Sequence, residues 1–400
     1  MTIRMEWTMR ERPQLSRRGF VGGVAASVGM LTLGAPTRLF ATERDLAAAL
    51  NPADDYDAFA KLSSNENPYG PPESVMKAMT GAFKYANRYG YPDSGLIDTI
   101  ARLHGVGVEN VLIGAGSGEI LDVVGSTFAA GGKKVLGVEP SFGAVYQHVT
   151  SIKGEAVTLP LTADFRQDIP ALIRTAKERY RDVGFIYLCN PNNPTGQIVT
   201  KQEVRQLLDG IPEGMPVLID EAYHHFVNDS DYATSVPYVI EGRPVIIART
   251  FSKIAALAGM RLGYAIAPKA MVEQMRPFST GTVSALVKYG GVAALQDTES
   301  QGAVKKITIA LRSRTTAELT SMGFSVIPSE GNFFMVNVRR PMQPLIAEFR
   351  SKGVLVGRPF PPMNQHLRVS VGTSDEMNRF VSAFKEIVAN PVKPAAAGGT

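Results

Sequence analysis

The chain has 400 residues, of which 44% are hydrophobic and 20% are charged, and it contains one cysteine, Cys189. This composition is close to that of ordinary soluble domains and excludes a disordered chain, a coiled coil and a collagen-like fibre. The lone cysteine excludes an internal disulfide framework and a thiolate-rich zinc site, and none of the five histidines has the spacing of a helical zinc site, so we predict no metal.

Residues 1–41 have the three zones of an export signal. Residues 1–18 are polar and basic, residues 19–36 are uncharged, apolar and rich in glycine, and residues 38–41 end in a small residue. Within this leader, Ser16-Arg17-Arg18-Gly19-Phe20 resembles the twin-arginine signal of bacteria. The resemblance implies a periplasmic protein that is exported already folded. The alternatives are a disordered basic extension or an anchor helix, and the protein is cytoplasmic if the leader does not function.

Most of the net charge of +5 belongs to the leader, which contains six arginines and two acidic residues. The remainder of the chain is nearly neutral, so a basic surface for nucleic acid is not predicted. The apolar run of the leader is short and glycine-rich for a stable membrane span, and no other long apolar segment follows it. We therefore expect no membrane span after processing.

Short apolar runs alternate with helical patterns from residue 111 onward. The runs are predicted strands, and they lie at Val111–Ile113, Lys134–Val138, Phe185–Leu188, Val217–Ile219, Val245–Ala248 and Gly263–Ile266. Several are apolar without alternation, as is typical of strands buried on both faces of a parallel sheet. Helical stretches such as 118–129 and 201–208 lie between them, and this order predicts a layered α/β domain.

The pattern changes after about residue 290. A long helical stretch at 292–322 leads to strands predicted at Phe324–Pro328, Phe333–Val338 and Leu367–Val371, which indicates a smaller α+β domain. The predicted organisation is a leader at 1–41, an N-terminal arm at 42–75, a large domain at 76–290, a small domain at 291–390 and a disordered tail at 391–400.

The informative side chains follow predicted strands, at the sheet edge where open α/β sheets bind ligands. The string Gly114-Ala115-Gly116-Ser117-Gly118-Glu119 follows the first strand and opens a helix. Its glycines let the backbone approach an anion, and the helix N-terminus offers free N–H groups, so a phosphate cradle fits as well as a tight strand-to-helix turn. A dinucleotide fingerprint would need glycine at position 119, where glutamate stands.

Two further motifs stand at the ends of later strands. Residues 189–196 read C-N-P-N-N-P-T-G, in which two prolines fix an extended path and the asparagines project amides, although an ordinary turn is the alternative. Asp220 ends another strand and Tyr223 follows three residues later. A buried aspartate here needs a cationic or donor partner, such as a protonated ring nitrogen, unless it caps the next helix.

The string Thr250-Phe251-Ser252-Lys253 follows a further strand, and Arg261 comes eight residues after the lysine. Two hydroxyls and a guanidinium suit a phosphate dianion. Among small and apolar neighbours the lysine amine is desolvated, which disfavours its ammonium form and makes it nucleophilic. The alternative is a lysine whose stem is buried while its charge reaches water.

Taken in this order, these motifs resemble those of the class I and II aminotransferases, which are pyridoxal 5'-phosphate enzymes of fold type I. The chain looks most similar to the histidinol-phosphate aminotransferase branch, because residues 62–70 (LSSNENPYG) and 88–93 (RYGYPD) are similar to strings of that branch. The resemblance covers roughly residues 56–388. It implies an α/β fold with a mostly parallel sheet between helices and a smaller α+β domain.

The resemblance implies a role for each residue of these motifs. Lys253 would hold the cofactor as an internal aldimine and then, as a free amine, move a proton between the substrate α-carbon and cofactor C4′. Asp220 would keep the pyridine nitrogen protonated. Asn193 and Tyr223 would donate to the phenolic oxygen of the ring, and Phe142 would stack on the ring face unless it is an ordinary core aromatic.

The cofactor phosphate would be held by the glycine-rich loop and the lysine motif together, through Gly116, Ser117, Gly118, Thr250, Ser252 and Arg261. Tyr91 would reach the phosphate from a neighbouring subunit, so the resemblance implies a homodimer. Glu119 stands where the family usually has an acid, whereas Gly118 replaces an aspartate that is common in the branch.

The substrate would be held mainly by arginines. Arg368 would clamp the α-carboxylate with two parallel hydrogen bonds. Arg358, ten residues earlier, would hold a substrate phosphate or else line a different side-chain pocket, and Tyr69 is the third predicted substrate contact. The implied reaction moves an amino group between an amino acid or amino-phosphate and a 2-oxo acid.

Two other functions remain as alternatives. A decarboxylase or lyase of the same fold, similar to threonine-phosphate decarboxylases, differs in whether a 2-oxo acid accepts the amino group. A non-enzymatic periplasmic binding protein would have lost the lysine, the aspartate or the arginine, and all three are present. Because histidine biosynthesis is cytoplasmic, an exported relative is expected to act on another amine.

Overall fold

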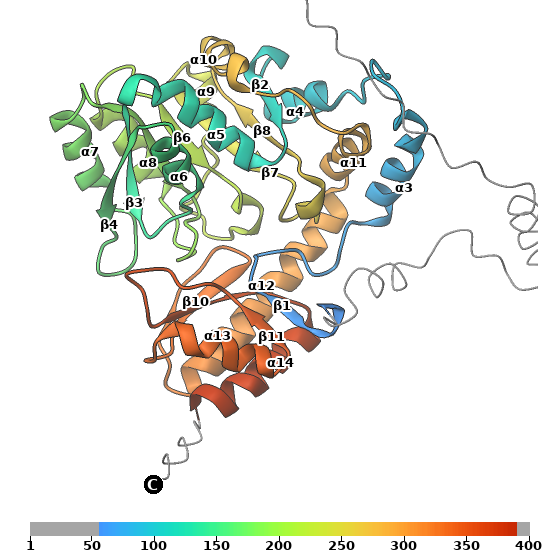
Figure 1. The fold of residues 1–400 in the computed structure, drawn as a ribbon, viewed down its shortest axis with the longest axis vertical. Coiled ribbons are helices and arrows are strands. Elements are labelled where there is room, and N and C mark those ends of the chain that lie inside the picture. Colours follow the sequence, from blue (N-terminus) through green and yellow to red (C-terminus); the bar gives the residue numbers. More distant parts are fainter. Residues whose placement is uncertain (1–55, 390–400) are drawn as a thin grey trace, which may run out of the picture. The chain divides into compact units, whose positions relative to one another are not determined.

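The computed structural model describes residues 56–389 (Figure 1). The predicted leader at 1–41 and the predicted tail at 391–400 lie outside the described residues. Tyr56–Ala58 form a short 3-10 turn, and residues 59–389 belong to one compact unit. Within the described range, no helix is both long and apolar enough to cross a membrane.

A seven-stranded sheet forms the centre of the larger part of this unit. Its strands, in spatial order, are β2 (Val111–Gly114), β8 (Gly263–Ile266), β7 (Val245–Thr250), β6 (Val217–Asp220), β5 (Val183–Cys189), β3 (Lys134–Glu139) and β4 (Glu155–Pro160). In this sheet β8 runs antiparallel to both of its neighbours, and the other pairs are parallel. The carboxyl ends of β5, β6 and β7 therefore meet at one edge, where a ligand site is expected.

Helices cover both faces of this sheet, which explains why its strands are apolar throughout. One face packs against α5 (Ser117–Phe128), α6 (Ala144–Ser151) and α10 (Lys269–Met275). The other packs against α4 (Leu96–His104), α7 (Ile169–Glu178), α8 (Lys201–Gly210), α9 (Val236–Ile240) and α11 (Ala285–Gln296), with α3 (Glu73–Ala82) against α11. Successive strand residues such as Val217 and Leu218 join opposite apolar clusters, since side chains alternate along a strand.

A second apolar core is formed by the C-terminal part, coloured orange to red in Figure 1, together with the N-terminal strand β1 (Ala60–Leu62), coloured blue. It contains residues of β1, β10 (Phe333–Asn337), β11 (Val354–Val356), β12 (His366–Ser370), α13 (Met342–Ser351) and α14 (Ser374–Phe384). β10 pairs antiparallel with β12 and with β9 (Val326–Ile327), and β1 pairs parallel with β11. The N-terminal strand thus delivers the segment that follows it, residues 63–66, to the C-terminal part.

The sequence predicted most of this architecture, but it missed the strands β4, β1 and β11 and placed one helix boundary wrongly. All six predicted strands of the large sheet are present, so the α/β fold is confirmed. The single helix predicted at 292–322 was wrong, because α11 ends at Gln296 and α12 (Thr298–Ser321) begins after Asp297. The Asp297 carboxylate accepts the N–H of Ser300 at 3.0 Å and so caps a new helix. The predicted domain boundaries remain predictions.

Candidate active site

A cavity of about 660 Å³ lies at the carboxyl ends of β5, β6 and β7, and it collects most of the predicted site residues. Its lining includes Ser117, Gly118, Phe142, Asn193, Asp220, Tyr223, Thr250, Ser252, Lys253, Arg261, Arg358 and Arg368. Three predicted site residues, Gly116, Tyr91 and Tyr69, do not line it. The cavity also borders on residues 63–66, which the sequence analysis did not assign to the site.

Lys253 projects its amine into this cavity from the loop that follows β7. Its Nζ donates a hydrogen bond to the backbone carbonyl of Ser64 at 3.1 Å and lies 5.7 Å from the centre of the Tyr223 ring. Burial, followed by the nearby Arg368 guanidinium, lowers the pKa of Lys253 to about 8. A larger fraction of the amine is therefore neutral near physiological pH than for an ordinary lysine, as a nucleophile or a base requires.

Asp220 is the last residue of β6 and is 2% exposed. Its carboxylate accepts hydrogen bonds from the Ala222 N–H at 3.1 Å and from the Tyr187 hydroxyl at 3.4 Å, but from no arginine or lysine among the described residues. Burial is the main cause that raises the pKa of Asp220 to about 6. A buried carboxylate without a cationic partner, facing a cavity, is suited to a protonated ring nitrogen of a ligand.

Arg368, Asn193 and Tyr223 form a chain of hydrogen bonds along the cavity wall. Arg368 Nη1 donates to Asn193 Oδ1 at 2.8 Å, and Asn193 Nδ2 donates to the Tyr223 hydroxyl oxygen at 3.2 Å. The ring of Tyr223 is fixed by edge-to-face packing on Phe333, with ring centres 4.9 Å apart. Burial raises the pKa of Tyr223, so its hydroxyl keeps its proton near neutral pH.

The guanidinium of Arg368 has unused hydrogen-bonding capacity. The side chain is 7% exposed, and its Nη2 donates to the backbone carbonyl of Ser63, but its Nε is buried and has no hydrogen-bond partner in the described part of the chain. Its guanidinium carbon lies 4.9 Å from the ring centre of Phe360 and 5.8 Å from that of Phe333, so two aromatic rings brace it. A buried donor without an acceptor next to a cavity marks a place for an anionic ligand group, such as a carboxylate.

The N-terminus of α5 supplies the other anion site. Gly116 adopts a φ of 85°, no side chain among the described residues caps the helix that begins at Ser117, and Ser117 and Gly118 line the cavity, so the first N–H groups of the helix are available to an anion there. This positive φ favours glycine, and a Cβ at Gly116 would in addition lie 2.2 Å from Nη2 of Arg261, so that guanidinium would have to shift. Gly116 therefore shapes the anion site from behind rather than lining the cavity.

Arg261, Thr250 and Ser252 complete this anion site. Arg261 Nη1 approaches the Ser252 hydroxyl at 3.4 Å, and the Thr250 hydroxyl donates to Ser252 Oγ at 2.8 Å. Two hydroxyls, a guanidinium and a helix N-terminus suit a phosphate dianion. With the amine of Lys253 and the carboxylate of Asp220 in the same cavity, the donor set fits pyridoxal phosphate.

Glu119 fixes the loop in front of α5. Its carboxylate accepts the Ala115 N–H at 2.6 Å and the Thr280 N–H at 2.9 Å. Burial acts to raise the pKa of Glu119, but these hydrogen bonds, together with those from the Thr280 and Ser279 hydroxyls, lower it overall. The acid that the sequence analysis noted after the glycine-rich loop thus stabilises the shape of that loop.

The remaining predicted residues lie at the margin of the cavity or outside it. Arg358 is exposed at the cavity wall, where its Nη1 donates to the Pro359 carbonyl and its guanidinium lies 4.3 Å from the Phe360 ring centre. Tyr69 instead lines a separate cavity of about 250 Å³. The Tyr91 hydroxyl donates to the Val283 carbonyl at 3.3 Å.

Residues 63–66 are the part of the cavity wall that the sequence analysis left without a role. The backbone carbonyls of Ser63 and Ser64 accept from Arg368 and Lys253, and Asn65 Nδ2 donates to the Tyr223 hydroxyl oxygen at 3.1 Å. The string at 62–70 had pointed to the family, but only the pairing of β1 with β11 brings it to the site.

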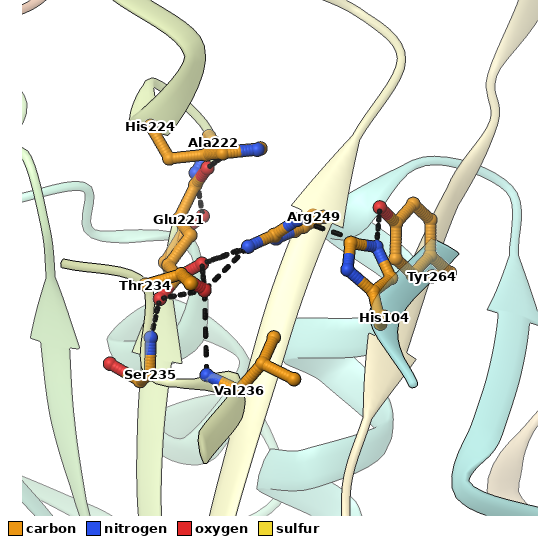
Figure 2. A network of polar contacts seen from close by, with 10 residues as sticks. His104, Glu221, Ala222, His224, Thr234, Ser235, Val236, Arg249 and Tyr264 are labelled. Atoms are coloured by element: carbon orange, nitrogen blue, oxygen red, sulfur yellow. Dashed lines mark hydrogen bonds and ion pairs between the residues drawn. The ribbon is translucent and has the colours of Figure 1, made fainter. Parts of the chain in front are cut away.

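A second polar network begins at Glu221, the residue that follows Asp220 in the chain (Figure 2). The Glu221 carboxylate is fully buried and accepts from Arg249 Nη2 at 2.7 Å, from the Thr234 hydroxyl at 3.0 Å and from the Ser235 N–H at 2.7 Å. Arg249 also contacts His104, whose pKa burial lowers to about 4. The network connects the ends of β6 and β7, which carry Asp220 and the Lys253 loop.

Comparison with known proteins agrees with this geometry. The family model for aminotransferase class I and II matches residues 58–384. A histidinol-phosphate aminotransferase of Moorella thermoacetica is 34% identical over 339 residues, which are 82% of this chain and 85% of that protein. An aromatic amino acid aminotransferase of Cutibacterium acnes is 35% identical over 333 residues, which are 82% of this chain and 92% of that protein.

A solved structure supports the fold. The histidinol-phosphate aminotransferase of Sinorhizobium meliloti, in complex with pyridoxal-5'-phosphate, superimposes with a TM-score of 0.77 at 24% identity, over 90% of this chain and 99% of that chain. The similarity therefore extends over the larger and the C-terminal parts together.

Proposed function

Since the chain belongs to the class I and II aminotransferases, which use pyridoxal phosphate, we propose that it moves an amino group between an amino acid or amino-phosphate and a 2-oxo acid, in the manner of the histidinol-phosphate aminotransferases. One observation carries the proposal. One cavity is lined by the amine of Lys253, the carboxylate of Asp220, which has no ion-pair partner among the described residues, and the guanidinium of Arg368, whose Nε has no hydrogen-bond partner there.

The cofactor would be held by the residues that surround this cavity. Pyridoxal phosphate supplies an aldehyde that bonds amines reversibly and a ring that accepts electrons from the substrate α-carbon. Its phosphate would be bound by the N-terminus of α5 with Thr250, Ser252 and Arg261, and Phe142 would pack on one ring face. Asp220 would hold the proton on the ring nitrogen, and the Tyr223 hydroxyl would donate to the phenolic oxygen.

Lys253 would carry out the proton transfer. Its Nζ, once free, would take the proton from the substrate α-carbon and hold it for return to the bound substrate and cofactor. The pKa of about 8 keeps part of the amine neutral at physiological pH, as this step needs. Arg368 would orient the substrate by binding its α-carboxylate, with the unpartnered Nε and the neighbouring amino nitrogens as donors.

The side chain of the substrate would lie toward Arg358. This arginine lines the cavity and extends its charge over the ring of Phe360, so it suits an anionic group such as a phosphate. The relatives named for histidinol phosphate and for aromatic amino acids support a substrate with a ring. Tyr69 lines the neighbouring cavity, so its proposed contact with the substrate would require residues 67–70 to move.

A homodimer in which Tyr91 completes the partner's site is also proposed. Tyr91 does not line the cavity of its own chain and stacks on Tyr85 with ring centres 6.1 Å apart. Close in sequence, Phe83 is 62% exposed and Tyr89 is fully exposed, as expected of an apolar surface that another subunit covers. Light scattering should give twice the mass of the chain, and Tyr91→Phe should weaken cofactor binding without changing that mass.

The leader supports a proposal of export to the periplasm. The arginine pair, the apolar run and the small-residue end occur in the order of a twin-arginine signal. Replacing Arg17 and Arg18 together by lysine should leave the protein in the cytoplasm, as measured by fractionation. Unchanged fractionation would remove the export proposal without affecting the catalytic one.

The catalytic proposal is tested with purified protein. A cofactor-loaded enzyme should absorb at about 400–430 nm, and a true amino donor should abolish that band. A 2-oxo acid should then restore the band and be recovered as the corresponding amino acid. Release of carbon dioxide without transfer of the amino group would instead identify the decarboxylase alternative.

A further inference from the structure

The hydroxyl of Tyr223 is surrounded by more donors than a cofactor contact needs. A tyrosine hydroxyl has two acceptor positions and one proton to donate. Both acceptor positions are filled, because Asn193 Nδ2 donates at 3.2 Å and Asn65 Nδ2 donates at 3.1 Å. Only the proton of the Tyr223 hydroxyl is left without a protein partner among the described residues.

The orientation of each asparagine amide is fixed by its second partner. Arg368 can only donate, so Asn193 must present its oxygen to Arg368 and its NH₂ to Tyr223. Asn65 Oδ1 lies 2.9 Å from the hydroxyl of Ser370, and that hydroxyl already accepts the Asn65 N–H at 2.7 Å. Ser370 is 1% exposed and its proton has no other acceptor in the described part of the chain, so Asn65 must also present its NH₂ to Tyr223.

We propose that Asn65 is a positioning residue that, with Asn193, forces the Tyr223 hydroxyl to act as a donor into the cavity. The inference rests on the proposed pyridoxal phosphate site, whose phenolic oxygen would accept this proton. Asn65 suits the position because it is 1% exposed and adopts a φ of 53°, a left-handed conformation that asparagine tolerates better than most residues.

Through Asn65, residues 63–66 would affect the protonation of the bound cofactor. Donation from Tyr223 stabilises the negative form of the phenolic oxygen and so lowers the pH at which the cofactor's absorbance band titrates. Burial, the first cause of the raised pKa of Tyr223, keeps its proton in place for this purpose. A reoriented or freely rotating hydroxyl would donate less well, and the titration midpoint would move to higher pH.

The test measures the absorbance midpoint and the cofactor dissociation constant in variants of Asn65. Asn65→Gly removes the donor and accepts the positive φ, and Asn65→Asp replaces the donor by an acceptor of the same shape. We expect the midpoint to rise by about 0.5–1 pH unit for glycine and by at least as much for aspartate, the size of a weakened hydrogen bond to a charged oxygen. Cofactor affinity should fall by about 3- to 10-fold, in proportion to that shift.

A double-mutant cycle separates positioning from general damage. In a Tyr223→Phe background, Asn65→Gly should cause no further shift, because the hydroxyl it orients is gone. Asn332→Ala is the matched control, since Asn332 anchors the carbonyls of Asn65 and Glu66 without contacting Tyr223, and its midpoint should equal that of the wild type.

Three results would overturn the proposal. They are a wild-type midpoint in Asn65→Gly, an undiminished shift in the Tyr223→Phe background, and an equal shift in Asn332→Ala. Absence of any absorbance band in the wild-type protein would instead refute the proposed function itself, so the two failures are distinguishable.

Discussion

Asp220 and Glu221 are neighbours in the chain, and both carboxylates are buried, yet their surroundings are opposite. Glu221 is fully buried and receives hydrogen bonds from Arg249, Thr234 and Ser235 (Figure 2). Asp220 is 2% exposed and, among residues 56–389, receives only one backbone N–H and a hydroxyl at 3.4 Å. The two side chains point away from each other, because successive side chains of an extended chain alternate.

The difference distinguishes a buried charge that stabilises the fold from a buried charge that is available to a ligand. A buried ion pair that is fully hydrogen-bonded holds the ends of β6 and β7 together, and its loss would leave an uncompensated charge. The Asp220 carboxylate has no ion-pair partner among the described residues and faces a cavity. Burial raises its pKa to about 6, because the Ala222 N–H, the Tyr187 hydroxyl and the charge of Lys253 offset that burial only in part. The first arrangement is complete without a ligand, whereas the second becomes complete only when a cation binds.

The largest effect is expected from Lys253→Ala, on the cavity side of this comparison. Removing the amine should lower kcat by about 10⁴-fold or more, since both the link to the cofactor and the proton transfer are lost. The fold should survive, because Nζ makes one hydrogen bond, to the Ser64 carbonyl, among the described residues. Single-turnover kinetics and circular dichroism measure the two outcomes.

The matched control for this variant is Lys269→Ala, at an exposed lysine whose side chain is 64% accessible. It should leave kcat unchanged. Borohydride treatment should attach a pyridoxyl mass to the peptide that contains Lys253 in the wild type and in the control. Transamination retained in Lys253→Ala would remove that residue from its proposed role.

On the structural side, Glu221→Gln is expected to act mainly on stability. It removes one partner of a pair whose side chains are 6% and 0% exposed, so the free energy of unfolding should fall by about 3–5 kcal/mol. Denaturant titration of the cofactor-free protein at neutral pH measures this loss. Asp220→Asn, its isosteric counterpart one residue away, should not destabilise the cofactor-free protein but should lower kcat at least about 100-fold. Equal losses of stability in both variants would end the distinction.

Arg368 combines features of the two carboxylates. Like Glu221 it is buried and hydrogen-bonded to protein groups, and like Asp220 it faces the cavity with hydrogen-bonding capacity left for a ligand. Arg368→Gln should cost about 2–5 kcal/mol of substrate binding if the α-carboxylate takes the unpartnered Nε, which is a rise in KM of about 30- to 4,000-fold. The effect on an amine substrate that lacks the carboxylate should be much smaller. An equal loss with both substrates would show that Arg368 acts only by holding Asn193.

Much of the fold and the site could be predicted from local patterns. The unbroken apolar runs identified the sheet because both of its faces are covered. The strand-end motifs, taken together, pointed to Lys253, Asp220 and Arg261, which line one cavity. Asn65 was not predicted because its role depends on Tyr223 and Ser370, which are 158 and 305 positions away in the chain. The pairing of β1 with β11 brings these residues near one another. The helix boundary at Asp297 was not predicted because an acidic residue is also compatible with a continuous helix. Only the structure shows that the Asp297 side chain caps α12.

The smallest expected effect is on the pH dependence of the free energy of unfolding, which tests whether the surroundings of Asp220 differ from those of Glu221. Because burial raises the pKa of Asp220 from 3.8 to about 6, the native state holds this proton more tightly than the unfolded chain does. The contribution to stability is therefore fully present below about pH 4 and is lost as the pH rises through about 6, on the order of 2–3 kcal/mol in total. Asp220→Asn lacks this loss, so in the cofactor-free state its unfolding free energy should match that of the wild type near pH 4 and exceed it above about pH 7. A constant difference across that range would mean that Asp220 already has a compensating cation in the cofactor-free protein, and that its surroundings do not differ in kind from those of Glu221.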